Sequence, residues 1–322
     1  MKRRDLARLT AGAALWPLAA PAHTMPVIGF LHSGTEEQNV PRVAAFRKAL
    51  ATAGFVEGRN VAIEFRWAGG RNERLAELAA ELIAAKVAVI ATLSSTPAAV
   101  AARKATDAVP IFFLIADPPV ELGLVASLNR PGGNATGIIT LAVELVPKRL
   151  ELLHQLAPRP TTLALIVNPQ HPSAKAVTAA HLKTSAALGA RGQVLKATSD
   201  AEIESAYGAL KPGTSLLIGT DPTFFARRAK FVALSARHAV PTMFDSIETA
   251  RQGGLLSYGA DIIALWERAA VNIARILKGA KPADLPVEQA TKFLFAVNMK
   301  TARALGLDIP QQLRLTADEV VE

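Results

Sequence analysis

The residues best suited to bind a small molecule stand in short polar loops that directly follow apolar, strand-like runs. Ser94, Ser95 and Thr96 follow the run 87–93, and the proline after them is typical of the first turn of a helix. Free amides and the positive end of the helix dipole at such a start favour an anion. The three hydroxyl residues are therefore candidates for holding a ligand carboxylate, although they could equally serve as a plain helix cap.

Acidic residues end several of the other strand-like runs. Asp117, Asp221, Asp245 and Asp261 could bind an amine or a hydroxyl, and Tyr258 could stack on a ligand. The first two aspartates precede proline and could instead be turn or cap residues. Donors from 94–96 facing acceptors from the second half of the chain would suit a zwitterion such as an amino acid. The candidate ligand-binding residues are Ser33, Gly34, Ser94, Ser95, Thr96, Asp117, Asn168, Thr220, Asp221, Asp245, Tyr258 and Asp261.

The elements that must position these loops alternate between strand and helix, twice over. Apolar runs at 27–32, 61–65, 87–93, 111–116 and 137–140 predict strands in the first half, and those at 163–167, 193–196, 215–218 and 240–245 predict strands in the second. Landmarks match between the halves: Pro97 corresponds to Pro222 and Pro110 to Pro241. The alternation predicts an α/β fold of two Rossmann-like lobes, each with a parallel sheet covered by helices. Ligands of such sheets bind beyond the carboxyl ends of the strands, where the polar loops would meet in one cleft.

The domain boundaries follow from this repeat. We expect a first lobe over 23–142 plus about 259–285 and a second over 143–258 plus about 286–322. The amphipathic stretch 262–277 predicts a helix that returns the chain to the first lobe, so several crossover segments would form a hinge.

The N-terminus has the pattern of an export signal. Residues 1–22 read MKRRDLARLTAGAALWPLAAPA, a basic start followed by an apolar stretch and an A-x-A ending. The alternative is a basic N-terminal helix of a cytoplasmic protein. We expect cleavage after Ala22 and a periplasmic location, and Arg3-Arg4 resembles the start of a twin-arginine signal.

Composition and missing motifs exclude several functions. The sequence has no cysteine, which rules out disulfides, thiolate metal sites and a lipid anchor on cysteine. The six histidines lack metal-ligand spacing, and the net charge of +9 is scattered rather than gathered into a nucleic-acid footprint. There is no GxSxG, Walker loop or GxGxxG motif, and His32 and Ser33, adjacent in a strand, point to opposite faces. We therefore expect no enzyme activity, no cofactor, no metal and no nucleic-acid partner.

Several stretches together resemble the ABC transporter substrate-binding proteins of the tryptophan/tyrosine-type group. They are VIGFLHSG, AGFVEGRNVAIEFRWA, ATLSSTPAA, VPIFFLIADPP, LGLVASLNRPGGNATG and FAVNMKTARALGLDIP. The resemblance implies a type I periplasmic-binding-protein fold with three crossovers and a ligand in the cleft, and some relatives bind aromatic amino acids. It also implies an ABC permease as membrane partner. We expect a monomer.

The predicted function is thus the periplasmic solute-binding component of an ABC importer that captures a small molecule such as an amino acid or a related carboxylate. Three alternatives remain. A two-lobed Rossmann-like enzyme would need a phosphate-binding loop, and a transcription regulator would need a helix-turn-helix. A binding protein that feeds a membrane sensor rather than a permease has the same sequence features.

Overall fold

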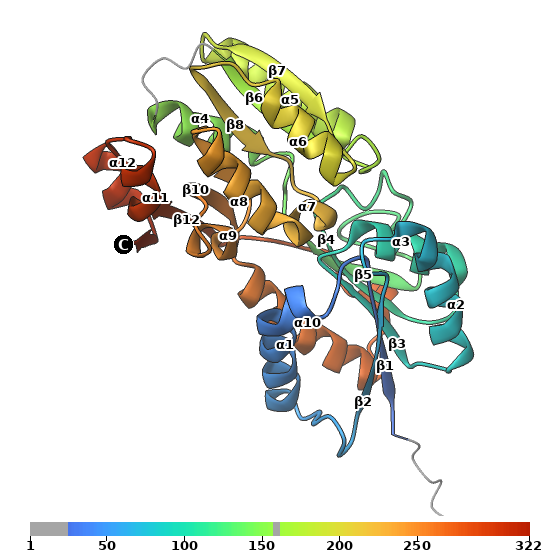
Figure 1. The fold of residues 1–322 in the computed structure, drawn as a ribbon. Helices are drawn as coiled ribbons and strands as arrows, with labels where there is room; N and C mark the ends of the chain where they lie inside the picture. The colour runs from blue at the N-terminus through green and yellow to red at the C-terminus, as the bar shows by residue number, and fades with distance from the viewer. Residues whose placement is uncertain (1–24, 157–161) are drawn as a thin grey trace, which may run out of the picture.

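The computed structural model describes residues 25–156 and 162–322, so the expected export signal lies outside the described residues. These residues form two lobes, each built on its own sheet (Figure 1). The first sheet has the order β11(Glu288–Gln289), β5(Ala135–Ile139), β4(Ile111–Ile115), β3(Val89–Leu93), β1(Val27–His32), β2(Ala62–Trp67), with parallel pairing throughout. The second has the order β13(Glu319–Val321), β12(Phe293–Asn298), β10(Leu256–Ala260), β9(Thr242–Phe244), β8(Thr214–Ile218), β6(Thr162–Val167), β7(Arg191–Lys196).

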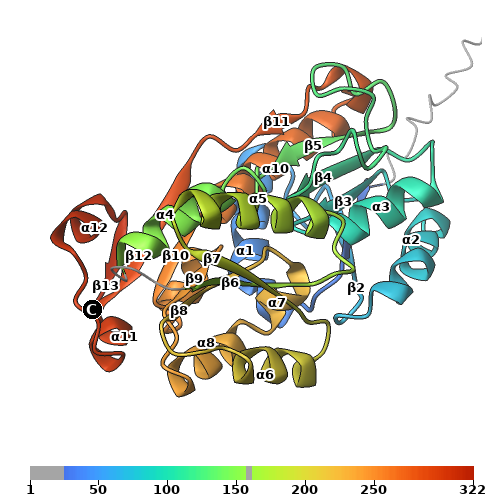
Figure 2. The same cartoon turned by 90° about the horizontal axis from the view of Figure 1, so that it is seen from above.

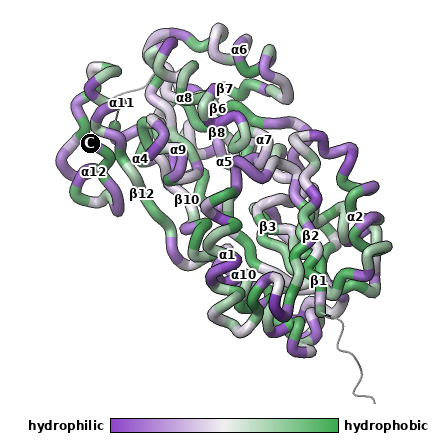
Figure 3. The backbone as a smooth tube through the Cα atoms, turned by 60° about the horizontal axis from the view of Figure 1, so that its bottom comes forward, coloured by the Kyte–Doolittle hydropathy of each residue, from purple (hydrophilic) through white to green (hydrophobic). Residues whose placement is uncertain are grey.

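The central strands of the first lobe are apolar runs because helices cover both faces of the sheet. Alternate residues point to opposite faces: Phe112 and Leu114 pack toward α1(Val40–Thr52) and α10(Ile262–Leu277), whereas Ile111 and Phe113 pack toward α2(Leu75–Ala84) and α3(Thr96–Ala105). In Figure 3 β1 is drawn mainly in the green of hydrophobic residues, whereas α2 alternates between green and purple. This pattern is that of a buried strand beside a half-buried helix.

The second lobe repeats this layering. One face of its sheet packs against α4(Val146–Leu156) and α5(Ala174–Ala187), and the other against α6(Asp200–Gly208) and α8(Arg228–Arg237). The shorter helices are α7(Pro222–Ala226), α9(Ile247–Arg251), α11(Met299–Ala304), α12(Gln311–Thr316), η1(Glu37–Asn39), η2(Asn72–Arg74) and η3(Pro282–Asp284). The expected α/β class with two Rossmann-like lobes is therefore confirmed.

Within the described residues the chain passes between the lobes three times, after β5, after β10 and after β11. Figure 2 shows α10 beside β5 and β11 in the first lobe, while β12 and the C-terminus lie with the second. β12 runs antiparallel to β10, contrary to the expectation of parallel sheets. The reason is connectivity: β10 leads toward the hinge and β12 returns from it, so the two strands run in opposite directions.

No helix in the described part of the chain is both long enough and apolar enough to cross a bilayer.

Candidate ligand-binding cleft

A cavity lies between the two lobes, beyond the carboxyl ends of β1, β3 and β4 on one side and of β8 and β9 on the other. It holds about 760 Å³ of space free of protein atoms, part of which opens to solvent. The lining residues are His32, Gln38, Asn39, Arg42, Ser94, Thr96, Leu114, Ile115, Ala116, Thr140, Ala142, Leu145, Arg149, His171, Thr220, Asp221, Pro222, Phe225, Asp245, Ser246, Ala260 and Ile262.

The predicted hydroxyl triplet divides between the cavity and the core. Ser94 and Thr96 line the cavity, whereas Ser95 is buried and caps α3, accepting a hydrogen bond from the amide of Ala98 at 3.4 Å. Ser94 has φ +58°, a left-handed conformation that is uncommon for a residue with a side chain, and its Oγ accepts a hydrogen bond from Trp266 Nε1 at 2.9 Å. The hydrogen bond from the indole therefore fixes the position of Ser94 just before the start of α3.

Ser33 and Gly34 support this wall without lining the cavity. The Oγ atoms of Ser33 and Ser95 lie 2.9 Å apart in a hydrogen bond, and the amide of Gly34 donates to Nδ1 of His32 at 2.8 Å. The loop after β1 is thus tied to the loop after β3, and it is His32 that reaches the cavity.

On the opposite wall, Asp221 is heavily engaged by the protein. Its carboxylate accepts hydrogen bonds from the amides of Thr223 (2.7 Å) and Phe224 (3.1 Å), from the hydroxyl of Thr223 and from Nδ2 of Asn168 (3.0 Å). Asp221 thus caps the N-terminus of α7 and also lines the cavity. Asn168 contacts Asp221 and lies outside the lining, so this pair fits the cap alternative raised by the Asp-Pro sequence.

Asp245 and Arg149 form the charged centre of the second wall. Arg149 is 3% exposed; its Nε donates to the carbonyl of Tyr258 at 2.7 Å and its Nη1 to Oγ1 of Thr220 at 3.0 Å. Burial lowers the pKa of Arg149, and the charge of Asp245 opposes that shift. Burial likewise raises the pKa of Asp245, opposed by the charge of Arg149 and a hydrogen bond from Thr220.

The second wall therefore carries the expected acceptors together with a cation that was not expected, Arg149. Arg149 was missed because it lies in a helix rather than in a strand-end loop. A signal was present: it stands among apolar residues, with Val146, Leu153 and Leu156 on the same helix face. An arginine on an apolar face needs buried acceptors, which Tyr258 and Thr220 supply.

Three further predicted residues lie away from the cavity lining. The ring of Tyr258 stacks on Phe293, with centroids 6.2 Å apart. Asp261 caps α10 through the amide of Ala264 and pairs with Lys292 at 2.8 Å, between two of the crossover segments. Asp117 is buried, with its Oδ1 3.6 Å from Nδ1 of His171 across the cleft.

Of the twelve predicted residues, five line the cavity within the described part of the chain. They are Ser94, Thr96, Thr220, Asp221 and Asp245.

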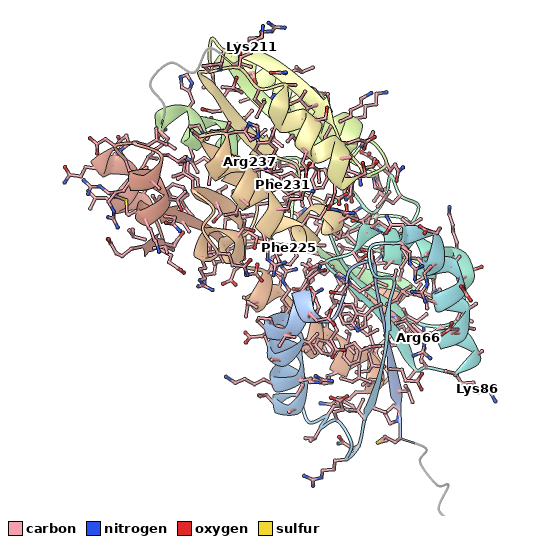
Figure 4. All side chains as sticks on the ribbon, viewed as in Figure 1. Arg66, Lys86, Lys211, Phe225, Phe231 and Arg237 are labelled. Carbon is pink, nitrogen blue, oxygen red and sulfur yellow. The ribbon has the colours of Figure 1, made fainter. Side chains whose placement is uncertain are left out.

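The lobes also touch each other directly beside the cavity. Arg42 of α1 forms two hydrogen bonds with Glu248 of α9, Nε to Oε1 at 2.8 Å and Nη2 to Oε2 at 2.9 Å, and its guanidinium lies 3.9 Å from the ring centroid of Phe225. Gln38 Nε2 donates to the carbonyl of Ala226 at 3.3 Å. Burial would raise the pKa of Glu248, but the charge and hydrogen bonds of Arg42 outweigh it and lower the pKa to about 2. Figure 4 shows Phe225 where the two lobes meet.

The site contains no metal-binding cluster among the residues that the structure describes: no three histidine or acidic side chains gather there in a suitable arrangement.

Comparison with known proteins identifies relatives along nearly the whole chain. A tyrosine-binding protein of Clostridioides difficile (strain R20291) is 27% identical over 277 residues, which is 85% of this chain and 78% of that protein. A domain protein from Vibrio cholerae has a TM-score of 0.85 at 22% identity, covering 92% of this chain and 100% of its own. A domain from Streptococcus pneumoniae crystallised with L-Trp has a TM-score of 0.84 at 24% identity, with the same coverage.

A ligand-free, open structure of a substrate-binding protein with adhesive properties from Clostridium difficile has a TM-score of 0.67 at 25% identity, covering 92% of this chain and 99% of that one. The expected type I periplasmic-binding-protein fold is confirmed by these neighbours. The family model described as ABC transporter substrate binding protein matches residues 36–321. With two lobes, a cleft at the strand ends and this match, the chain belongs to the ABC transporter substrate-binding protein family.

Proposed function

We propose that this chain is the periplasmic solute-binding component of an ABC importer and that it binds an aromatic amino acid between its lobes. The observation that carries the proposal is the pair of buried opposite charges, Asp245 and Arg149, in the wall of the interlobe cavity. Burial disfavours the ionised form of Asp245 even beside Arg149, and a ligand ammonium would stabilise that form further.

Asp245 is the partner for the ligand ammonium. The hydrogen bonds of Arg149 to Tyr258 and Thr220 hold its guanidinium in place. Its charge therefore favours the ionised form of Asp245 and opposes the rise that burial causes in the pKa of that carboxyl, and a ligand ammonium would act in the same direction. On the first wall, Ser94, Thr96 and the amides of the first turn of α3 suit the ligand carboxylate. A zwitterion satisfies both walls at once.

The rest of the cavity suits an apolar side chain. Leu114, Ala142, Leu145, Phe225 and Ile262 are among its lining residues. The names of two relatives point the same way, one a tyrosine-binding protein and the other a domain in complex with L-Trp.

Closure of the lobes over the ligand is the proposed mechanism. The three crossover segments act as the hinge, and Arg42–Glu248 joins the lobes beside the cavity. Ligand contacts from both walls favour the closed arrangement, whose combined surface is what a permease would recognise. One chain contains the complete cleft, so we expect the protein to act as a monomer. We also expect it to bind its ligand without catalysing a reaction.

Calorimetry on residues 23–322 with L-tyrosine, L-tryptophan, L-phenylalanine and L-leucine tests the ligand class. Asp245→Asn should weaken binding of the aromatic amino acids more than tenfold, because losing a buried charged partner costs about 2–5 kcal/mol. The deaminated analogue 3-phenylpropionate should bind the wild type weakly and should be insensitive to Asp245→Asn. Asp107→Asn, on the exposed surface, is the matched control. Wild-type protein that binds none of these amino acids would refute the proposal.

Export is tested separately. Mass spectrometry of the periplasmic fraction should find a chain that begins at His23. An intact chain retained in the cytoplasm would contradict the export part of the proposal.

A further inference from the structure

Two buried polar atoms of the first lobe, both on cavity-lining residues, have no protein partner. They are Nε2 of His32 and Oδ1 of Asn39, and neither forms a hydrogen bond with any residue in 25–156 or 162–322. The side chains are 4% and 1% exposed. Buried polar groups nearly always have a partner, so these two atoms indicate a ligand group that the main charged contacts do not explain.

The hydrogen bond on the other ring nitrogen determines the proton on His32. Nδ1 accepts the amide hydrogen of Gly34 at 2.8 Å and therefore carries no proton itself. Burial, with a smaller contribution from the charge of Arg42, lowers the pKa of His32 to about 3. The imidazole is thus neutral at physiological pH, and its single proton is on Nε2.

The ring of His32 is held in its orientation by aromatic neighbours. Its centroid lies 6.3 Å from that of Phe30, with the planes nearly parallel, and 5.1 Å from that of Trp67. His32 follows Phe30 on the same face of β1, so the row of aromatic residues in the core ends at the cavity with a hydrogen-bond donor.

Asn39 supplies the complementary acceptor. Its Nδ2 donates to the carbonyl of Thr35 at 2.9 Å, which leaves Oδ1 as the free end of the amide. Both residues belong to the short segment from the end of β1 to the start of α1. One wall of the cavity therefore offers a neutral donor and a neutral acceptor from one loop.

We propose that His32 Nε2 and Asn39 Oδ1 together bind a neutral hydroxyl on the ligand side chain, which makes this loop the part of the site that selects a phenol over a plain phenyl ring. The hydroxyl oxygen accepts from His32 and its proton is donated to Asn39. The inference rests on the proposed amino-acid ligand, whose charged ends are bound by Asp245 and by Ser94 with Thr96. An indole N–H could satisfy Asn39 but would leave His32 unpaired.

The test compares dissociation constants for L-tyrosine and L-phenylalanine, which differ by one hydroxyl. Wild-type protein should prefer L-tyrosine by about 10- to 100-fold, in line with one or two buried hydrogen bonds. His32→Phe keeps an aromatic ring between Phe30 and Trp67 and removes the donor. It should bring the ratio of the two dissociation constants to within about threefold of unity.

The matched control is Trp67→Phe, which alters the ring beside His32 but not a cavity-lining residue; it should keep the preference. O-methyl-L-tyrosine, which lacks the hydroxyl proton, should bind wild-type protein at least about tenfold more weakly than L-tyrosine, and this comparison needs no variant. The ratio should also stay constant between pH 5 and pH 8, about the range in which an ordinary histidine would titrate.

The outcomes separate this inference from the proposed function. Equal affinity of wild-type protein for the two amino acids, or an unchanged ratio in His32→Phe, overturns the hydroxyl site and leaves amino-acid binding standing; an ordered water would then satisfy His32. A preference that appears only below about pH 6.5 overturns the neutral donor. Failure to bind any of the amino acids overturns the proposed function and this inference with it.

Discussion

Removing the ion pair between Arg42 and Glu248 should weaken ligand binding by destabilising the closed arrangement of the lobes. The two side chains come from different lobes and are 6% and 16% exposed, and they meet through two hydrogen bonds of 2.8 and 2.9 Å. A hinge opening would separate them, so their interaction contributes to the closed arrangement. Ligand affinity includes the free energy of closing, and a weaker closed state therefore raises the dissociation constant.

The size of the effect can be estimated from Glu248. Its pKa falls from 4.5 to about 2 although burial raises it; Arg42 supplies the largest part of the lowering, and Ser246 and Arg228 of the same lobe as Glu248 supply the rest. At about 1.4 kcal/mol per pKa unit the net shift is on the order of 3 kcal/mol, most of which would be lost when opening removes Arg42. That amounts to roughly 100-fold in affinity. Because the closed-state pKa lies below the ordinary value, the contribution is complete above about pH 5 and is lost as the pH falls from 4.5 toward 2.

Calorimetry with the tightest-binding aromatic amino acid is the assay. Arg42→Ala, which leaves a buried carboxylate without its cation, should raise the dissociation constant about 30- to 150-fold. The double variant Arg42→Ala/Glu248→Gln should recover part of the loss, since no unpaired charge remains. X-ray scattering should show the single variant to be more extended at equal ligand concentration.

The matched control is Arg251→Ala, which breaks a similar two-bond contact with Glu319 inside the second lobe. It should leave ligand affinity within about twofold, because pairs exposed to solvent contribute little and this one does not span the cleft. If Arg42→Ala behaves like Arg251→Ala, the ion pair does not contribute to closure and the reasoning is wrong.

Three further substitutions should each give a distinct result. Asp221→Ala removes the cap of α7 and should cost about 1–2 kcal/mol of unfolding free energy, seen as a fall of several degrees in Tm; an unchanged melting curve would contradict the cap role. Gly259→Ala would place a methyl carbon 1.8 Å from the carbonyl oxygen of Asp245, so it should lower both soluble yield and ligand affinity, and wild-type behaviour would show that the strands can separate there. Trp266→Phe removes the indole donor to Ser94 and should weaken ligand binding about 3- to 30-fold by calorimetry while the secondary structure by circular dichroism is unchanged; equal affinity would mean that Ser94 needs no anchor.

Much of the fold could be predicted because local pattern determines it. The runs 27–32 and 163–167 are apolar and end at polar turns, and each is a parallel strand of one lobe. The predicted helix 262–277 appears with those bounds, since its apolar face is continuous and Asp261 caps its start. The antiparallel course of β12 could not be predicted in this way, because strand direction depends on where the chain crosses between lobes.

The candidate site, like the fold, could be predicted from the sequence only in part. The sequence by itself determined that polar loops follow the strands and that parallel strands bring these loops to one edge, and five of the predicted residues do line the cavity within the described residues. Tertiary structure alone decided which other side chains complete it. Arg149 reaches the cavity from a helix, His32 from the last position of a strand, and Arg42 meets Glu248 from the other lobe. The apolar face around Arg149 could have indicated its burial, but the charge partners of Arg149 and Arg42 lie more than 90 positions away in the chain and meet them only when the lobes fold and approach each other.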